Sequence, residues 1–286
     1  MNEERFDYIV VGAGTAGCLL ANRLSADPST RVLLVEAGGE DRYLWIHIPV
    51  GYLYCIGNPR TDWLFRTVEE PGLGGRSIGY PRGKVFGGSS SINGMIYMRG
   101  QRGDYDRWAA DANPGWSWDE VLPYFVRHED HHTLDAGGSD PLHGHGGEWR
   151  VERARVTWEI LDAFRDAAAQ AGIPPSDDFN RGDNFGCGYF EVNQKRGVRW
   201  NASKAFLRPV LHRPNLKVVT HAQVNGLVRR TDGSGRVEGV EYRIGGASGE
   251  SKRTLCDGEV VLSAGAIGSP QILQCAGIGA GARLRE

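Results

Sequence analysis

Six residues near the N-terminus have the spacing of a dinucleotide-binding turn. The segment Gly12-Ala13-Gly14-Thr15-Ala16-Gly17 reads G-x-G-x-x-G, and Glu36 closes the next apolar run along the chain. In this pattern the first glycine permits a tight turn, the second lets backbone approach a pyrophosphate, and the third lets helix and strand pack closely. The N-terminus of the following helix offers N–H groups to the phosphates. The motif therefore predicts a nucleotide-binding site.

Glu36 narrows the choice of nucleotide. A carboxylate at this position accepts hydrogen bonds from a ribose and repels a 2′-phosphate, which favours FAD or NAD over NADP. NAD dehydrogenases usually repeat β-α units compactly. Here residues 40–115 are instead rich in Gly, Pro, Trp and Tyr with little periodicity. Such a long irregular stretch is uncommon unless it serves a site, so we expect a second contact surface for a flavin and favour FAD.

The segment RGKVFGGSSSINGM, residues 82–95, is the candidate for that second surface. Gly87 and Gly88 remove side chains where backbone must lie close to a ligand or a helix. The three serines at 89–91 can present N–H and hydroxyl donors to phosphate oxygens, and Asn93 offers a donor and an acceptor to the polar edge of a flavin. A flexible serine–glycine linker is the alternative, but the flanking runs RGKVF and MIYM disfavour it.

Apolar runs place the first motif on a β-α-β unit. Residues 7–12 (DYIVVG) and 31–39 (RVLLVEAGG) predict buried strands, and residues 14–26 predict a helix between them. This arrangement implies a parallel strand pair with a right-handed crossover.

Later segments predict one amphipathic helix and several more strands. We expect Thr157 to cap a helix that ends at Gly172, with a core face formed by Trp158, Leu161, Phe164, Ala168 and Ala171. The runs NLKVVTHAQVNGLVRR and RVEGVEYRI predict two strands joined by the turn TDGSG. A further strand is expected in GEVVLSAGAIGSP, and QILQCAGIG is expected to begin a helix.

Composition excludes several classes of protein. The 286 residues include 33 Lys and Arg against 35 Asp and Glu, so no basic excess indicates nucleic-acid binding. Mean hydropathy is −0.39, and no apolar run approaches the ~18 residues of a spanning helix. The acidic N-terminus MNEERFDYIV does not resemble a signal peptide. We predict a cytoplasmic protein, although peripheral membrane association and a homo-oligomer are compatible with the sequence. The five cysteines form no CxxC pair, which favours reduced thiols.

Two further groups of polar residues invite a functional interpretation. Five of the eight histidines lie between His128 and His145, and a metal site is one interpretation. Their spacing gives no H-x-x-x-H on a predicted helix and their surroundings are glycine-rich, so we expect a polar loop and no metal. Asp104 and Asp106 are candidates for paired acid–base carboxylates, but nearby arginines favour structural ion pairs.

Taken together, the motifs resemble those of glucose–methanol–choline (GMC) oxidoreductases, closest to the choline dehydrogenase and alcohol dehydrogenase branch. The motifs are FDYIVVGAGTAG with LLVEAGG, NPRTDW, GKVFGGSSSINGMIYMRGQRGDYDRW and GAIGSPQILQCAGIG, which span residues 6 to 279. The resemblance implies FAD-dependent oxidation of an alcohol by hydride transfer to flavin N5, with a quinone or oxygen as electron acceptor. It leaves open a lyase that keeps FAD without net redox chemistry, and a flavin-binding remnant without activity.

The resemblance also implies contacts with FAD for a set of residues. The pyrophosphate is assigned to Gly12, Gly14, Thr15, Ala16 and Gly17, and the adenosine to Glu36, Ala37, Trp63 and Val224. The flavin channel and the path to the ring are assigned to Arg82, Gly83, Val85, Gly87, Gly88, Ser89, Asn93, Gly94, Met95 and Ile96, and the phosphate end to Ala264 and Gly265.

Two departures from the family pattern modify these expectations. Some members attach FAD covalently through a histidine where this chain has Ile92, so a non-covalent flavin is implied. Family enzymes are longer and carry their catalytic base near the C-terminus, so no catalytic residue is assigned to this chain. We therefore expect an α/β protein with a Rossmann-like FAD-binding domain at residues 1–145 and 195–286. Residues 146–194 are expected to form part of an antiparallel-sheet substrate domain, with the C-terminal half of the family architecture absent.

Overall fold

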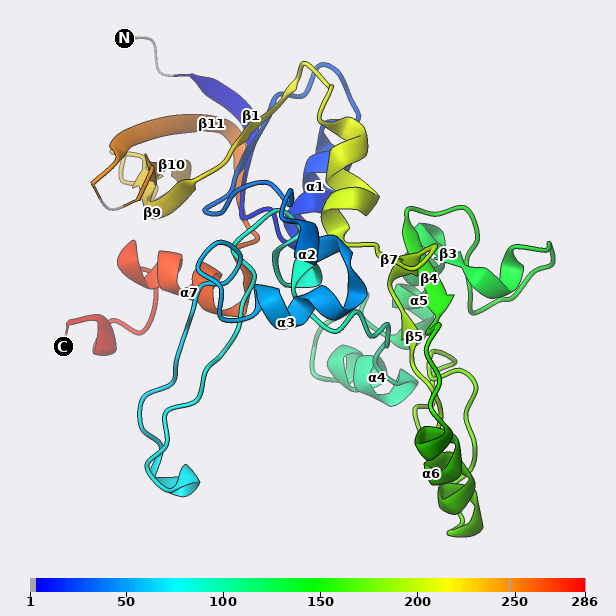
Figure 1. Cartoon of the computed structure of the whole chain (residues 1–286). Coiled ribbons are helices and arrows are strands. Elements are labelled where there is room, and N and C mark those ends of the chain that lie inside the picture. Colours follow the sequence, from blue (N-terminus) through cyan, green and yellow to red (C-terminus); the bar gives the residue numbers. More distant parts are fainter. Residues whose placement is uncertain (1–3, 247, 286) are drawn as a thin grey trace. The chain divides into compact units, whose positions relative to one another are not determined.

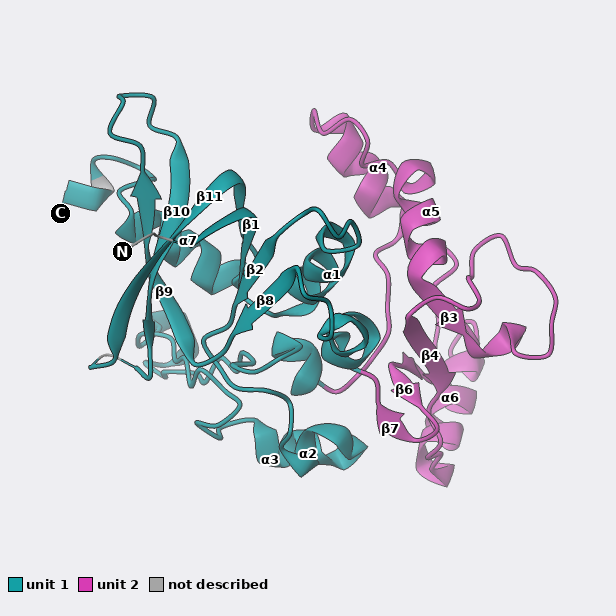
Figure 2. Cartoon of the chain, turned by 90° about the horizontal axis from the view of Figure 1, so that it is seen from above, with its two compact units in different colours: residues 1–93, 201–286 teal, residues 94–200 magenta. Residues whose placement is uncertain are grey.

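The computed structural model of the chain describes residues 4–246 and 248–285 (Figure 1). It divides into two compact units, Met1–Asn93 with Asn201–Glu286, and Gly94–Trp200 (Figure 2). The predicted boundaries at residues 145 and 195 differ from this division, because residues 94–145 and 195–200 belong to the second unit. Backbone pairing explains the difference. Ile96 forms a β-bridge with Val192, and the Tyr97 N–H donates to the Glu191 carbonyl at 2.8 Å.

The first unit contains a six-stranded mixed sheet. Its order is β8 (Leu216–Val219), β2 (Val32–Val35), β1 (Arg5–Val11), β11 (Glu250–Leu262), β10 (Val237–Ile244) and β9 (Ala222–Arg229). The first four strands run parallel, and β10 pairs antiparallel with both β11 and β9. All four residues of β2 are buried, as expected of a central parallel strand. The predicted β-α-β unit is confirmed by the parallel β1–β2 pair joined through α1 (Thr15–Leu24).

The remaining elements of the first unit are mostly short. They are α2 (Leu44–His47), α3 (Tyr52–Cys55) and α7 (Gly265–Cys275), together with 3₁₀ turns at Pro49–Gly51, Pro71–Leu73, Gly88–Ser91, Arg208–Val210 and Arg283–Arg285 and a π-helical turn at Ser203–Leu207. Two predictions are wrong here. The run that begins NLKVV divides into β8 and β9 at His221, whose φ is 54°, and the two strands pair with different neighbours. The last helix begins at Gly265, before the predicted start.

The second unit combines three helices with short strands. Its helices are α4 (Arg102–Ala110), α5 (Trp118–His128) and α6 (Glu159–Gln170), and capping boxes begin α4 and α5. The strands are β3 (Glu129–His131), β4 (Trp149–Arg153), β5 (Glu191–Val192), β6 (Gln194–Lys195) and β7 (Val198–Arg199), with a 3₁₀ turn at His132–Leu134. β4 pairs antiparallel with β5 but parallel with β3, so this sheet is mixed.

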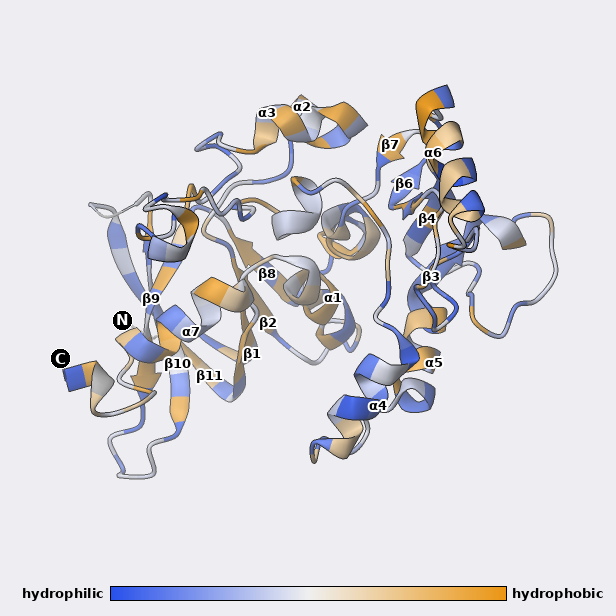
Figure 3. Cartoon of the chain, turned by 90° about the horizontal axis from the view of Figure 1, so that it is seen from below, coloured by the Kyte–Doolittle hydropathy of each residue, from blue (hydrophilic) through white to orange (hydrophobic). Residues whose placement is uncertain are grey.

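Helix α6 departs from its predicted packing. Trp158 precedes the helix without a side-chain capping bond, so Thr157 is not the cap. Trp158, Leu161 and Phe164 are exposed at 62%, 48% and 68%, and only Ala168 of the predicted core face is buried. The apolar residues of this helix are coloured orange in Figure 3. The expected core face is therefore wrong within this unit, because periodicity predicts a helix without identifying what covers it. Among the described residues, no helix has the length and apolar character needed to span a membrane.

Candidate cofactor-binding site

A cavity of about 540 Å³ lies in the first unit, where β1, β2 and β11 end and β9 begins. Its volume falls in the range of about 300–1,000 Å³ that small-molecule and cofactor pockets occupy. Fourteen of the residues assigned to FAD line it, namely Gly12, Gly14, Thr15, Ala16, Glu36, Ala37, Trp63, Arg82, Gly83, Gly88, Ser89, Val224, Ala264 and Gly265. A site outside the carboxyl ends of parallel strands is the usual ligand position in open α/β sheets.

The turn after β1 excludes side chains at two positions. Gly12 has φ 96°, and a Cβ there would lie 2.7 Å from the Ser263 carbonyl oxygen. A Cβ on Gly17 would lie 1.8 Å from the Gly12 carbonyl oxygen, so Gly17 allows α1 to pack against the turn. No side chain caps α1 at Gly14, which leaves the helix N-terminus available to an anion.

Glu36 is buried at the end of β2 and receives two backbone hydrogen bonds. The Ala13 N–H donates to its Oε2 and the Gly38 N–H to its Oε1, both at 2.7 Å. Burial raises the pKa of Glu36, while these two donors and the charge of Lys84 oppose the rise. Each carboxylate oxygen keeps further acceptor capacity, which suits a ribose hydroxyl.

The Gly88–Ser91 turn lies directly against the first motif. The Gly87 N–H donates to the Ala13 carbonyl at 2.8 Å, and a Cβ on Gly88 would lie 2.8 Å from the Gly14 Cα. Ser89 lines the cavity, and its Oγ accepts a hydrogen bond from the Gly83 N–H at 3.2 Å. The two glycine-rich segments therefore form one continuous backbone surface.

The prediction that all three serines offer hydroxyls to a phosphate is wrong for two of them. The Ser90 hydroxyl donates to the Gly87 carbonyl and the Ser91 hydroxyl to the Phe86 carbonyl, each at 2.6 Å. Both hydroxyl protons are therefore used inside the turn. The spacing of the serines could not reveal this difference, because it depends on which way each side chain points.

Seven of the residues assigned to FAD lie outside the cavity lining. Gly17 and Gly87 support the two turns, and Asn93 follows the second turn, its N–H donating to the Ser89 carbonyl at 2.9 Å. Val85 instead borders a second cavity of about 500 Å³. Gly94, Met95 and Ile96 belong to the other compact unit.

Sequence reasoning missed part of the lining. Phe65 stacks on Trp63 with ring centroids 5.6 Å apart, and Ser263 and the first turns of α7 complete the wall. Parallel strands present their carboxyl ends at the same edge, so pairing β11 with β1 would have pointed to Leu262 and Ser263. No periodic signal reveals that pairing across so long an interval.

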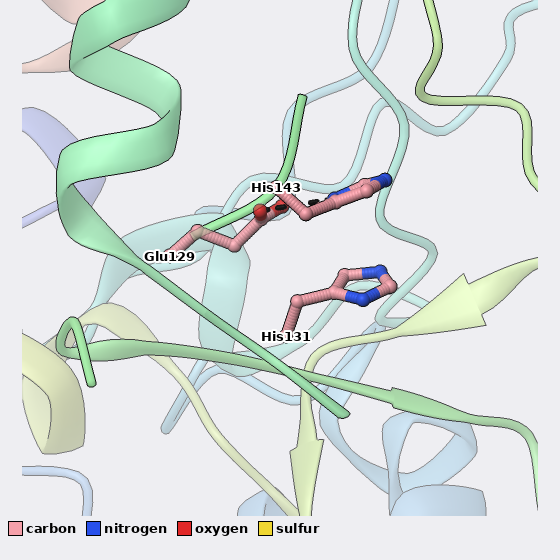
Figure 4. Close-up of side chains that lie close together, drawn as sticks. All are labelled: Glu129, His131 and His143. Carbon is pink, nitrogen blue, oxygen red and sulfur yellow. Dashed lines mark hydrogen bonds and ion pairs between the residues drawn. The ribbon is translucent and has the colours of Figure 1, made fainter. Parts of the chain in front are cut away.

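The second unit holds a separate cluster of buried polar side chains (Figure 4). His143 Nδ1 lies 3.0 Å from Glu129 Oε2, and His143 Nε2 lies 2.9 Å from Asp178 Oδ2. Because both ring nitrogens face carboxylates, both carry hydrogen and the ring is an imidazolium. Burial alone would lower the pKa of His143, but the bonds and charges of Asp178 and Glu129 raise it to about 9. Arg99 donates to Glu129 Oε1 at 2.6 Å.

The other two histidines of this cluster share one carboxylate. His131 Nε2 and His132 Nε2 lie 3.0 and 2.9 Å from the two oxygens of Glu191. The His131 ring stacks on His143 at 3.8 Å between centroids, as Figure 4 shows. Among the described residues, Glu129, His131 and His143 have potential ligand atoms within 4.8 Å of one another. Since these atoms are already engaged in hydrogen bonds, we interpret the cluster as an ionic network. The expectation of a simple polar loop at 128–147 is wrong.

Comparison with known proteins identifies the family. Residues 6–284 match the GMC oxidoreductase family, so the chain belongs to it. It is 40% identical over 281 residues to an alcohol dehydrogenase [acceptor] of Pseudomonas putida and 42% identical over 288 residues to an oxygen-dependent choline dehydrogenase of Staphylococcus xylosus. These matches cover 98% and 99% of this chain and 50% of each relative. The chain thus spans about half the length of the curated relatives it matches.

Solved structures give the same result for the fold. Pyridoxine 4-oxidase from Mesorbium loti matches with a TM-score of 0.89 and 36% identity, covering 98% of this chain and 53% of that one. An FAD-dependent oxidoreductase from Chaetomium thermophilum matches with a TM-score of 0.86 and 30% identity, covering 96% and 48%. The resemblance and the Rossmann-like α/β class drawn from the sequence are confirmed.

Proposed function

We propose that this chain forms the FAD-binding part of a GMC oxidoreductase that oxidises alcohols. The observation that carries the proposal is the cavity in which the G-x-G-x-x-G turn, Glu36 and the Gly88–Ser91 turn meet. The names of the relatives, which include an alcohol dehydrogenase and a choline dehydrogenase, support an alcohol or choline as the substrate.

The residues present fit the chemistry of FAD. Gly12 and Gly88 line the cavity, and a Cβ at either position would collide with neighbouring backbone. The α1 N-terminus would hold the pyrophosphate. Glu36 would accept from the ribose, and Val224 would contact the adenine. A bound flavin supplies the acceptor for the hydride from the CH–OH carbon.

The cavity lining supplies binding groups and no evident proton acceptor for an alcohol. Of the described residues that line it, none is a histidine, and its one carboxylate, Glu36, already accepts two backbone hydrogen bonds. We therefore assign the general base to the part of the longer family members that this chain does not cover. We propose a quinone or oxygen as the electron acceptor. The name of one relative, an oxygen-dependent choline dehydrogenase, supports oxygen, and that of another, an alcohol dehydrogenase [acceptor], leaves the acceptor unspecified.

The flavin is proposed to bind non-covalently. Ile92 occupies the position considered for a covalent link, is 2% exposed and packs with Ile46, Cys55 and Val85. An aliphatic side chain offers no nucleophile. After acid precipitation the flavin is expected in the supernatant, and yellow colour retained in the washed pellet would contradict this. The cytoplasmic location and the homo-oligomer remain predictions.

A comparison of two flavins tests the proposed site. The apoprotein is titrated with FAD and with FMN, and binding is followed by the quenching of flavin fluorescence. The cavity is built around an adenosine and a pyrophosphate, so FAD is expected to bind at one equivalent per chain and FMN at least tenfold more weakly, a difference of about 1.4 kcal/mol. Equal affinity for the two flavins would overturn this assignment.

A further inference from the structure

A chain of buried hydrogen bonds lies behind the Gly88–Ser91 turn, on residues that do not line the cavity. Its central members are Asp41, Ser91 and Asn201, which are 1%, 0% and 1% exposed. They come from three segments widely separated in sequence, all within the first compact unit. Polar side chains buried this completely need hydrogen-bond partners. The chemistry of each group then identifies the donor and the acceptor of each bond.

Asn201 is the centre of this chain of bonds. Its Nδ2 donates to Asp41 Oδ2 at 3.0 Å and to Ser91 Oγ at 2.8 Å, while its Oδ1 accepts from the Lys204 N–H at 3.0 Å. Both amide hydrogens are therefore used. Ser91 Oγ accepts from Asn201, so its own proton is free to donate to the Phe86 carbonyl at 2.6 Å. The carbonyl that precedes Gly87 is thus tied to Asn201 through one hydroxyl.

Asp41 anchors the other end. Arg208 donates to Asp41 Oδ1 from Nε at 3.1 Å and from a terminal nitrogen at 2.8 Å, and Ser203 Oγ donates to the same oxygen at 3.2 Å. Hydrogen bonds to a charged acceptor are stronger than those between neutral groups. The carboxylate therefore fixes the Asn201 amide with both hydrogens committed, and through it the orientation of Ser91.

A second, parallel connection reaches the neighbouring serine. The Ala202 N–H donates to Ser90 Oγ at 3.0 Å, and the Ser90 hydroxyl donates to the Gly87 carbonyl. The segment beginning at Asn201 thus contacts the turn at two consecutive hydroxyls. Ser89, the remaining serine, faces the cavity. The three serines therefore divide into one that lines the cavity and two that fix the turn.

We propose that Asn201 and Asp41 are positioning residues for the cofactor: acting through Ser91, they hold the Gly88–Ser91 turn in the place where it forms one wall of the FAD cavity. This inference rests on the proposed function. The turn leaves little room for displacement, since a Cβ on Gly88 would approach Gly14 Cα to 2.8 Å. Without the hydrogen bond from Asn201, the turn that forms this wall of the cavity could move. FAD would then bind more weakly, although no group proposed to contact FAD has been removed.

The test measures cofactor affinity separately from stability. Asn201→Ala, Ser91→Ala and the double variant are prepared as the full chain, with Ser203→Ala as the matched control, because Ser203 donates to the same carboxylate but not to the turn. For each apoprotein the melting temperature is recorded, and FAD affinity and dissociation rate are measured well below it. The visible circular dichroism of the bound flavin reports on the shape of its site.

Either single variant is expected to weaken FAD binding about tenfold or more and to change the flavin circular dichroism, whereas Ser203→Ala changes affinity less than about threefold. The double variant is expected to be no weaker than the poorer single variant, since both remove the same connection. If Asn201→Ala does not fold, Ser91→Ala carries the same test.

Two results would overturn the inference, and they are distinguishable. If the unchanged chain binds FAD and both single variants bind it equally well, with only the melting temperature lowered, the network is structural and the inference alone fails. If the unchanged chain does not bind FAD at all, the proposed function fails and the inference fails with it.

Discussion

Two polar centres of the described residues, the candidate cofactor cavity of the first unit and the histidine network of the second, are built in opposite ways. The lining of the candidate cofactor cavity includes glycines of three backbone turns, Gly12, Gly88 and Gly265, and Glu36 is its one carboxylate. The network of the second unit is made of side-chain charges, centred on Glu129, His143 and Arg99. The uncapped N-terminus of α1 leaves its backbone N–H groups for a ligand, while paired side-chain charges satisfy one another.

This contrast determines what each centre is sensitive to. A buried charge that loses its partner retains the cost of having left water, so the network should respond strongly to the loss of single charges. The cavity should respond through affinity for its ligand, with smaller changes in stability. The following five predictions test this contrast, in order of decreasing expected effect.

Glu129→Ala is expected to produce the largest loss of stability, about 3–5 kcal/mol. Glu129 accepts from Arg99 at 2.6 Å, from the Gly144 N–H at 2.8 Å and from His143 at 3.0 Å, and the Arg99 and Glu129 side chains are at most 1% exposed. Unfolding in denaturant measures the loss, with the exposed Asp166→Ala as the control. A loss of unfolding free energy below about 1 kcal/mol would show that Glu129 does not compensate buried charges in this network.

The unfolding free energy should also fall on the alkaline side of neutrality. The folded-state pKa of His143 is about 9, above its ordinary value of 6.5, so its contribution is complete below pH 6.5 and is lost as the pH rises through 9. The loss amounts to about 3 kcal/mol. His143→Gln should flatten this part of the pH profile, whereas His145→Ala, at an exposed position, should leave it in place. An alkaline slope that survives His143→Gln would refute the assignment.

The loss of stability expected at acid pH comes from a lowered carboxyl pKa, whereas the alkaline loss comes from a raised histidine pKa. Burial would raise the pKa of Glu191, but the hydrogen bonds from His131 and His132 lower it to about 2. A carboxyl group with a lowered pKa stabilises the fold above its ordinary pKa, and that contribution is lost as the pH falls toward 2. Unfolding in denaturant, repeated at a series of acid pH values, measures this loss of unfolding free energy.

Glu36→Ala addresses the cavity. It removes a charge-assisted acceptor for the ribose, so FAD affinity should fall by about 1.5–3 kcal/mol, roughly 10- to 150-fold. Titration of the apoprotein measures the change, and Glu40→Ala, which borders the second cavity, serves as the control. An FAD affinity equal to that of the unchanged chain would place the ribose elsewhere.

Arg107→Ala provides the smallest effect and a reference for surface charge. Arg107 lies 3.0 Å from Asp104, with both side chains about half exposed or more, and exposed pairs of this kind contribute about 0.2–1 kcal/mol. The change in unfolding free energy should stay within that range. A loss comparable to that of Glu129→Ala would remove the distinction between buried and exposed charges.

The same contrast explains which features could be predicted from sequence. The first β-α-β unit with its glycine-rich turn follows from a local pattern, since a Cβ on Gly17, for example, would collide with the Gly12 carbonyl five residues earlier. The second unit depends on contacts between distant segments. Glu191 meets His131 across sixty positions, and no spacing rule connects them.

Side-chain direction accounts for the other differences. The serines at 90 and 91 look like phosphate ligands, yet their hydroxyls turn inward because carbonyls of the same turn accept them. Trp158 and Phe164 have the helical spacing of a core face but are exposed within this unit. A linear pattern identifies which residues share a surface and says nothing about what lies opposite.

The pairing of β1 with β11 has a consequence for folding during synthesis on the ribosome. In the folded sheet, residues Phe6 to Val11 of β1 lie beside Cys256 to Leu262 of β11. The ribosome therefore synthesises β1 roughly 250 residues before this neighbouring strand. At about 5–20 residues per second, the ribosome leaves the apolar β1 without that neighbour for roughly 12–50 s. The Gly94–Trp200 segment is continuous and can complete its own contacts during this interval. The cavity is lined by Ser263 and the start of α7, so it can form only after these residues have been synthesised.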